Sequence, residues 1–203
     1  MTMITAVPIT TTTEHSPRPM AAPYQPSLLR LLHGLTAVVA LLCWFTGAAV
    51  YSQFDGRWGH LPLELPEAID LHGTAGFLLK LVAGPFVLYA LTLGRARLRR
   101  PANAVALLAL LLSLISGLLM NEDWLREGQL DHLVYHLHLL GWLLFTAAVL
   151  WHGLAQLRRG GPALALSMLQ LRLRPGDGPA DWPAQVRRFF GFPSSKSPPG
   201  PSD

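Results

Sequence analysis

The sequence predicts an all-α integral membrane protein, a four-helix bundle with cytoplasmic N- and C-termini. Composition, four long apolar runs and the distribution of charge lead to this prediction. The chain has 203 residues, of which 51% are hydrophobic and only 14% are charged, whereas soluble domains carry about 25% charged residues. Apolar side chains in this abundance are expected to be buried in lipid.

Four apolar runs are long enough to cross the hydrocarbon core as helices. They comprise 19 to 26 residues each, and about 20 helical residues span the core. A membrane strand would need only about ten residues of alternating polarity, so these continuous runs, rich in Leu and Ala, exclude strands. The runs cover residues 28–51, 68–93, 102–120 and 133–157.

Charged residues between the runs indicate the orientation. The segment between the second and third runs and the segment after the fourth run are basic, and the other two loops are acidic. Because basic loops stay on the cytoplasmic side, we expect the acidic loops outside. The basic residues are Arg95, Arg97, Arg99, Arg100, Arg158 and Arg159, and the acidic ones are Asp55, Glu64, Glu67, Asp70, Glu122, Asp123, Glu127 and Asp131.

The expected transmembrane domain covers residues 27–158, with a tail at each end. Residues 1–26 are rich in Thr and Pro and are expected to be disordered. Residues 159–203 form a partly disordered cytoplasmic tail, in which residues 164–173 could form a short helix. Residues 182–192 mix Arg187 and Arg188 with Trp and Phe, which suits a segment lying on an anionic membrane surface. The lone Cys43 excludes both an intrachain disulfide and a c-type haem attachment.

Four histidines lie inside the predicted spans, where ionisable side chains are rare and usually functional. His33 and His152 lie near the inner ends of the first and fourth runs. His72 and His138 lie near the outer ends of the second and fourth runs. The four therefore form an inner pair and an outer pair.

His138 and His152 share one face of the fourth helix. They are fourteen residues apart, which is just under four turns and about 21 Å along the axis. Two haems stacked in a bundle need ligands with this offset, and His33 and His72 would supply the opposing ligands. A single buried histidine is more often a hydrogen-bonded core residue, but two pairs matched in depth favour iron ligands.

Other residues near these histidines have two interpretations each. Lys80, near the middle of the second span, either faces the bundle interior, to balance a haem propionate or gate a proton, or reaches a carbonyl or a water-filled crevice. Nearby glycines serve either close approach of a flat macrocycle or helix packing. These glycines are Gly34, Gly73, Gly76, Gly141 and Gly153. His136, His132, His60 and His15 are expected to be ordinary surface, interface or tail residues.

Three segments resemble the prokaryotic cytochrome b561 family, which is related to the b-type subunits of nickel–iron hydrogenases and formate dehydrogenases. They are Arg30-Leu-Leu-His33-Gly, Leu71-His72-Gly-Thr-Ala-Gly76, and His138 through Leu150-Trp-His152-Gly. The resemblance covers about residues 28–157. It implies a four-helix bundle with two haem b groups, His33 and His152 being the axial ligands of the inner haem iron and His72 and His138 those of the outer one.

The expected function is transmembrane electron transfer between a quinone pool and a redox partner. Such a cytochrome belongs to a respiratory electron transport chain in a bacterial inner membrane or an equivalent energy-transducing membrane. It would work as an electron carrier or as the membrane subunit of an oxidoreductase, alone, as a homodimer or in a larger complex. No nucleophile, general-base pair or phosphate-binding loop is visible, so we predict no catalytic residue, and no nucleic acid partner is expected.

Two other classes of function stay open. One is a histidine-based metal-binding or metal-transport membrane protein, because histidine binds zinc and copper. Such sites usually cluster three or four ligands, which two pairs separated by about 21 Å fit poorly. The other is a haem-free accessory subunit.

Overall fold

The computed structural model describes residues 23–190. Within this range all regular structure is helical, and four helices are long and apolar enough to cross a membrane. They are α1 (Ser27–Phe54), α2 (Ala68–Leu91), α3 (Pro101–Leu119) and α5 (Leu133–Leu166). The shorter elements are η1 (Arg95–Arg99), α4 (Asp123–Arg126), η2 (Ser167–Leu169), η3 (Pro179–Asp181) and α6 (Trp182–Phe189). The predicted all-helical fold with four spans is confirmed.

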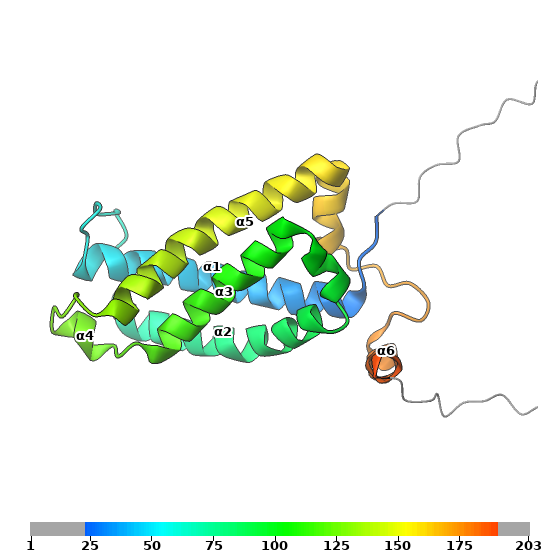
Figure 1. Ribbon diagram of the computed structural model, residues 1–203, viewed down its shortest axis with the longest axis horizontal. Coiled ribbons are helices and arrows are strands. Elements are labelled where there is room, and N and C mark those ends of the chain that lie inside the picture. The colour runs from blue at the N-terminus through cyan, green and yellow to red at the C-terminus, as the bar shows by residue number, and fades with distance from the viewer. Residues whose placement is uncertain (1–22, 191–203) are drawn as a thin grey trace, which may run out of the picture.

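The four long helices form two hairpins that lie side by side (Figure 1). In the first hairpin α1 packs along α2, and in the second α3 packs along α5. The helices α2 and α3 make few contacts with each other although η1 connects them. Each hairpin is therefore closely packed within itself, and the interior between the hairpins has room for a site.

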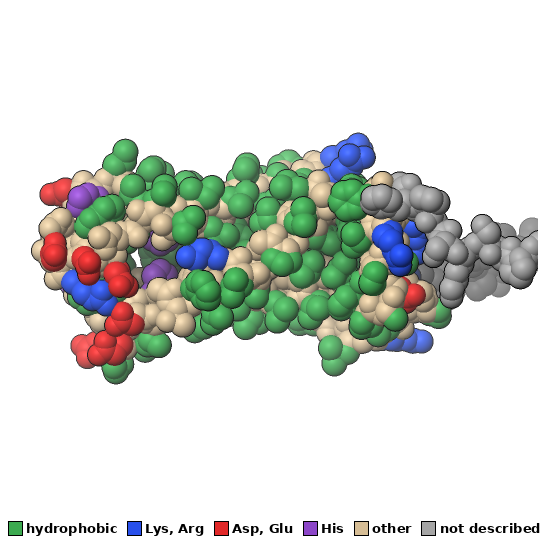
Figure 2. All heavy atoms as spheres, turned by 90° about the horizontal axis from the view of Figure 1, so that it is seen from below, with side chains coloured by type: hydrophobic (Ala, Val, Ile, Leu, Met, Phe, Trp, Pro, Cys, Tyr) green, Lys and Arg blue, Asp and Glu red, His purple; other side chains and the backbone are tan. Residues whose placement is uncertain are grey.

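Apolar side chains cover the outside of the bundle over most of its length (Figure 2). Val38, Leu108 and Leu150 are 63–70% exposed in the middle of their helices. A helix that is apolar all round needs lipid or other protein around it. Together with the length of the helices, this surface identifies a multi-pass integral membrane protein.

The two ends of the bundle differ in charge, as Figure 2 shows. The loops of residues 55–67 and 120–132 carry seven of the chain's twelve acidic residues and form what we call the acidic end. The opposite end, called the basic end, contains η1 with its arginines and the start of α1.

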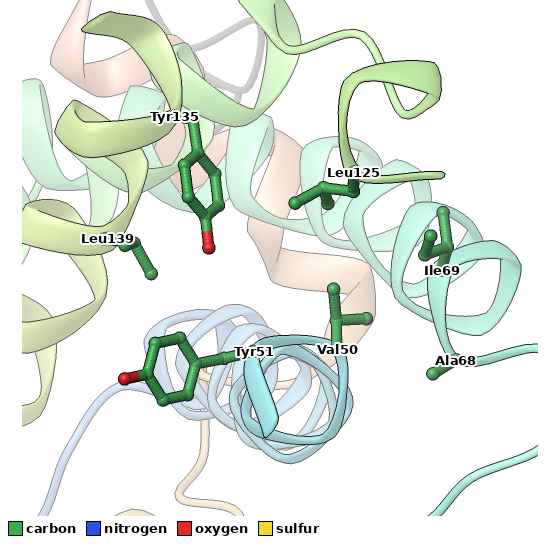
Figure 3. Packing of buried hydrophobic residues seen from close by; sticks show 7 residues of the cluster. All are labelled: Val50, Tyr51, Ala68, Ile69, Leu125, Tyr135 and Leu139. Carbon is green, nitrogen blue, oxygen red and sulfur yellow. The ribbon is translucent and has the colours of Figure 1, made fainter. Parts of the chain in front are cut away.

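Two clusters of buried side chains hold the helices together. The first lies at the acidic end, where Tyr135 of α5 points toward α1 and donates a hydrogen bond to Asp55 at 2.6 Å (Figure 3). Its buried members are Val50, Tyr51, Ala68, Ile69, Leu125, Tyr135 and Leu139. The second cluster, near mid-bundle, contains Ala40, Leu79, Ala83 and Leu110. Small alanines let the helices approach closely, as is common in membrane bundles.

The segment after α5 folds back onto the start of α1. The α5 helix breaks at Gly160 and Gly161, where Gly161 has φ of 62°, and Pro162 follows. The predicted domain boundary at residue 158 thus lies two residues before the break, and the short helix expected over 164–173 is present only as far as Leu169. Of the segment expected over 182–192, residues 182–189 form α6, which lies crosswise to the bundle (Figure 1).

Asp177 caps α1 from this returning segment. Its carboxylate accepts a hydrogen bond from the backbone N–H of Ser27 at 2.8 Å, 150 residues away in sequence. Helix N-termini have unpaired N–H groups, and an aspartate is among their best partners. Arg30 is buried and donates to the carbonyls of Gln170 and Arg172. The predicted tail is therefore anchored to the bundle at least to Asp177.

Candidate functional site

The structure brings the four intramembrane histidines together in two pairs. At the basic end His33 of α1 faces His152 of α5, with ring centroids 6.2 Å apart and an interplanar angle of 33°. At the acidic end His72 of α2 faces His138 of α5, with centroids 6.0 Å apart and an angle of 67°. These are the two pairs that depth along the sequence predicted, and each joins the first hairpin to the second.

The spacing within each pair suits one metal ion held between two rings. Two imidazoles on opposite sides of a metal, with metal–nitrogen bonds of about 2 Å, have ring centres about 6 Å apart. A direct hydrogen bond between the rings is not found in either pair among the described residues. The separation is thus too long for a direct hydrogen bond between the rings and right for a shared ligand.

Hydroxyl groups orient both rings of the acidic-end pair. Nδ1 of His72 lies 3.0 Å from Oγ1 of Thr46, and Nδ1 of His138 lies 3.0 Å from Oγ of Ser116. Each hydroxyl also donates to a carbonyl one turn earlier on its own helix, at 3.0 Å for Thr46 and 2.7 Å for Ser116. A hydroxyl has one proton, and with that proton on the carbonyl its oxygen is placed to accept from Nδ1–H of the ring. Nε2 of each ring is then the free lone-pair donor that a metal requires.

A glycine follows each of these two hydroxyl residues and gives the ring its space. A Cβ at Gly47 would lie 3.0 Å from Cε1 of His72, and a Cβ at Gly117 would lie 3.0 Å from Cε1 of His138. Contacts this short force a shift in one of the partners. Each ring of the acidic-end pair therefore packs against a hydroxyl–glycine dipeptide. His72 packs against Thr46-Gly47 on α1, and His138 packs against Ser116-Gly117 on α3.

A cavity of about 420 Å³ contains the acidic-end pair. Apolar and aromatic side chains dominate its walls, as expected for a cofactor site. His72, His138, Trp142, Phe145, Lys80 and Glu122 are among the residues that line it. The Nε1 of Trp142 is buried without a hydrogen-bond partner within residues 23–190. The donor set, the spacing and the cavity together fit a flat group with a central metal.

The basic-end pair has different surroundings. Phe86 of α2 packs edge-on against His33, with centroids 5.8 Å apart. Nδ1 of His152 is buried and has no hydrogen-bond partner among the described residues. Buried polar atoms are rarely left unpaired. The ring spacing and the two imidazole donors fit a shared metal here too, but within residues 23–190 no hydroxyl orients the rings.

Comparison with known proteins agrees with this geometry. The family model described as "Prokaryotic cytochrome b561" matches residues 24–170. The chain belongs to the prokaryotic cytochrome b561 family. The match extends beyond the expected 28–157 and includes part of the segment that returns to α1. No curated protein and no solved structure matches the chain.

Membership of the cytochrome b561 family makes the chain a b-type cytochrome of the membrane, with haem binding and electron transfer as its general role. The separations of 6.0 and 6.2 Å are compatible with iron as the shared metal. Such a cytochrome needs its haem ligands on facing helices of the bundle. All four histidines meet that requirement.

The remaining histidines have other partners. Nε2 of His136 lies 3.1 Å from Nη1 of Arg57, and its Nδ1 bonds to the carbonyl of His132. His132 stacks on Trp124 with centroids 3.9 Å apart, and Nδ1 of His60 bonds to the carbonyl of Ser52. These three have the surface and interface positions expected of them. His15 lies outside the described residues.

Four residues that contact the acidic-end histidines of this cytochrome b561 relative do not stand out in the sequence alone. Thr46, Gly47, Ser116 and Gly117 were not singled out, although a hydroxyl–glycine dipeptide recurs near the acidic end of two runs, which is a usable signal. Of the glycines that were singled out, Gly141 packs against Ser113 of α3, where a Cβ would lie 3.0 Å from Oγ. Gly34, Gly76 and Gly153 have nothing within 4 Å of an added Cβ.

Proposed function

We propose that this chain holds two haem b groups and passes electrons across the membrane. His72 and His138 would be the axial ligands at the acidic end, and His33 and His152 those at the basic end. The observation that carries the proposal is the separation of the paired rings, 6.0 and 6.2 Å. This is the spacing of two imidazoles that share one iron.

The chain's own residues would position the two redox centres and keep water from them. A haem with two histidine ligands exchanges single electrons at its iron and is tuned by its ligands and its burial. His138 and His152 would hold the two haems about 21 Å apart along α5. Electron transfer across the membrane would then be divided into shorter steps. Thr46 and Ser116 hold the acidic-end rings in the tautomer that binds metal.

We also propose the orientation and the partners. The arginines of η1 support a cytoplasmic basic end, so that the acidic loops would face out and both termini would lie inside. Electrons would pass between the quinone pool and a redox partner of a respiratory chain, because a lipid-soluble carrier reaches a bundle surrounded by lipid. The membrane would be a bacterial inner membrane or its equivalent, and the apolar outer face leaves room for a homodimer or a larger complex.

The other two functions are less well supported. A zinc or copper transport site usually gathers three or four ligands, and residues 23–190 contain no group of three His, Cys, Asp or Glu side chains suited to a metal ion. A haem-free accessory subunit would leave both histidine pairs without a purpose, and buried ionisable groups in membranes are costly.

The test is the haem content of the purified full-length chain. We expect a reduced-minus-oxidised spectrum of b type and two haems per chain in a pyridine haemochrome assay. His138→Ala should retain one haem, since the acidic-end site loses a ligand. His136→Ala is the matched control, two residues away on the same helix, and should retain two. A wild-type chain without haem, or two haems in His138→Ala, would contradict the proposal.

A further inference from the structure

Lys80 places a positive charge near the middle of the second span, on an exposed position at the edge of the acidic-end cavity. It is the thirteenth of the 24 residues of α2 and lines the acidic-end cavity together with His72 and His138. Figure 2 shows basic side-chain atoms midway along the bundle, beside a hollow in which histidine is visible. An ammonium group at this depth needs an anionic or strongly polar partner. None of the ion pairs formed within residues 23–190 includes Lys80.

The side chain of Lys80 extends toward the N-terminal end of α2, which is the end that carries His72. Side chains on a helix tilt toward its N-terminus, and His72 lies on that side. Nζ of Lys80 is 5.9 Å from the ring centroid of Phe77, one turn nearer the N-terminus. The Cα atoms of Lys80 and His72 are about 12 Å apart along the helix axis. The flexible four-carbon side chain of lysine brings its ammonium group closer to His72 than that distance. The ammonium group can therefore reach the edge of a macrocycle centred between His72 and His138.

At the other end of the cavity the nearby cation, Arg126, already has carboxylate partners. Glu122 lines it there and pairs with Arg126 at 3.3 Å. Arg126 also contacts Asp70 at 2.6 Å and Asp123 at 3.7 Å. Three carboxylates already surround this guanidinium, so another carboxylate would add repulsion. Within the cavity, the favourable position for an added carboxylate is beside Lys80.

We propose that Lys80 binds a propionate carboxylate of the haem at the acidic end. This haem would then lie with that carboxylate directed toward the middle of the membrane and away from Glu122. The inference rests on the proposed haem site and adds a residue that determines how the macrocycle is oriented. An ammonium–carboxylate hydrogen bond is stronger than a neutral one, and more so at low dielectric.

The first test measures haem retention in the purified full-length chain. The rate of haem loss to an excess of a haem-free globin is compared for wild type, Lys80→Met and Lys80→Arg. Lys80→Met should lose one of its two haems about tenfold faster, the effect of one hydrogen bond to a charged group. Lys80→Arg keeps the charge and should stay near the wild-type rate. In a His138→Ala background, which retains only the basic-end haem, Lys80→Met should have no effect.

The second test removes the carboxylates from the ligand. Chains reconstituted with the dimethyl ester of the same iron porphyrin should lose the acidic-end group at equal rates in wild type and Lys80→Met, because the interaction needs both partners. In wild type alone, the ester should leave that site about tenfold faster than natural haem, which keeps the inference testable if Lys80→Met does not fold.

Two results would overturn the inference. One is equal loss of natural haem from wild type and Lys80→Met, which would mean that the lysine faces lipid. The other is the same acceleration by Lys80→Met with natural and esterified haem. A wild-type chain that binds no haem at all would instead overturn the proposed function, so the two failures are distinguishable.

Discussion

Nδ1 of His138 lies 3.0 Å from Oγ of Ser116, whose own proton goes to the carbonyl of Leu112 at 2.7 Å. Because the carbonyl can only accept, this arrangement favours the Nδ1–H tautomer of His138, with Nε2 directed elsewhere. Thr46 does the same for His72. Nothing comparable orients His33 or His152 within the described residues.

Removing the Ser116 hydroxyl should raise the midpoint potential of the acidic-end haem. A hydrogen bond from Nδ1–H makes the imidazole a better electron donor and favours ferric iron. Its loss in Ser116→Ala is worth about 1 kcal/mol, on the order of 40 mV for one electron. A redox titration followed in the visible spectrum should show one of two potentials shifted, and Ser116→Thr should restore it. A shift of both potentials would point to a general structural effect.

A methyl group at Gly117 should weaken the acidic-end site. The Cβ of Gly117→Ala would approach Cε1 of His138 to 3.0 Å, so the ring must turn or α3 must move. Overpacking of this kind costs about 1–3 kcal/mol. We expect part of the chains to lack one haem and the remainder to lose it faster. The control is Gly84→Ala on α2, where nothing lies within 4 Å of the added Cβ. Equal haem content in the two variants would argue against close packing of Gly117 against the His138 ring.

The acidic end should lose stability at low pH through Asp55. Burial raises the pKa of this carboxyl, but hydrogen bonds from Arg57 and Tyr135 outweigh it and hold the pKa below its ordinary value. The stabilisation is therefore complete above the unfolded pKa of about 3.9 and is lost as the pH falls through the lower folded value.

Asp55→Asn removes this dependence. We expect the variant to be less stable than wild type at neutral pH by about 1–3 kcal/mol, the range for a hydrogen bond to a charged group. The difference should shrink below about pH 4. Thermal unfolding in detergent, followed by circular dichroism across this pH range, measures both. A constant difference at every pH would mean that the charge of Asp55 does not contribute.

Asp177 should limit the access of proteases to the segment that follows α5 and returns to α1. Tyr24 donates to its carboxylate at 2.5 Å, and Ser27 donates through its backbone N–H at 2.8 Å. Loss of a helix N-cap costs about 1 kcal/mol, so Asp177→Ala should increase tryptic cleavage after Arg172 several-fold. Asp123→Ala, at the acidic end, serves as control and should leave cleavage after Arg172 unchanged. The same rate in both variants would show that other contacts hold the segment.

Features that depend on local sequence were predicted well. Hydropathy located the four spans to within a few residues, because lipid requires an unbroken apolar helix of a certain length. The depth of a histidine in its span follows from counting residues, and so the pairing of His72 with His138 was expected before the structure. The ligand roles of these histidines stay predictions.

Features that depend on helix rotation were not predicted. Thr46 and Ser116 form the i−4 carbonyl bonds common to hydroxyls in membrane helices, and nothing local shows that a histidine of the neighbouring helix is the second partner. The cap from Asp177 joins residues 150 apart, and no periodicity signals a contact of that kind. Lys80 was recognised as unusual, but its place in the cavity required the packing of both hairpins.

Each histidine pair takes one ring from the first hairpin and one from the second. Helical hairpins can insert into a bilayer one at a time and associate sideways afterwards. A haem bound between the hairpins at either level would add its binding free energy to the association of the two hairpins. The contacts between α2 and α3 alone are few. Assembly of the bundle is then coupled to haem supply: in a haem-starved cell the two hairpins would be held together by the two buried clusters alone and would associate less tightly.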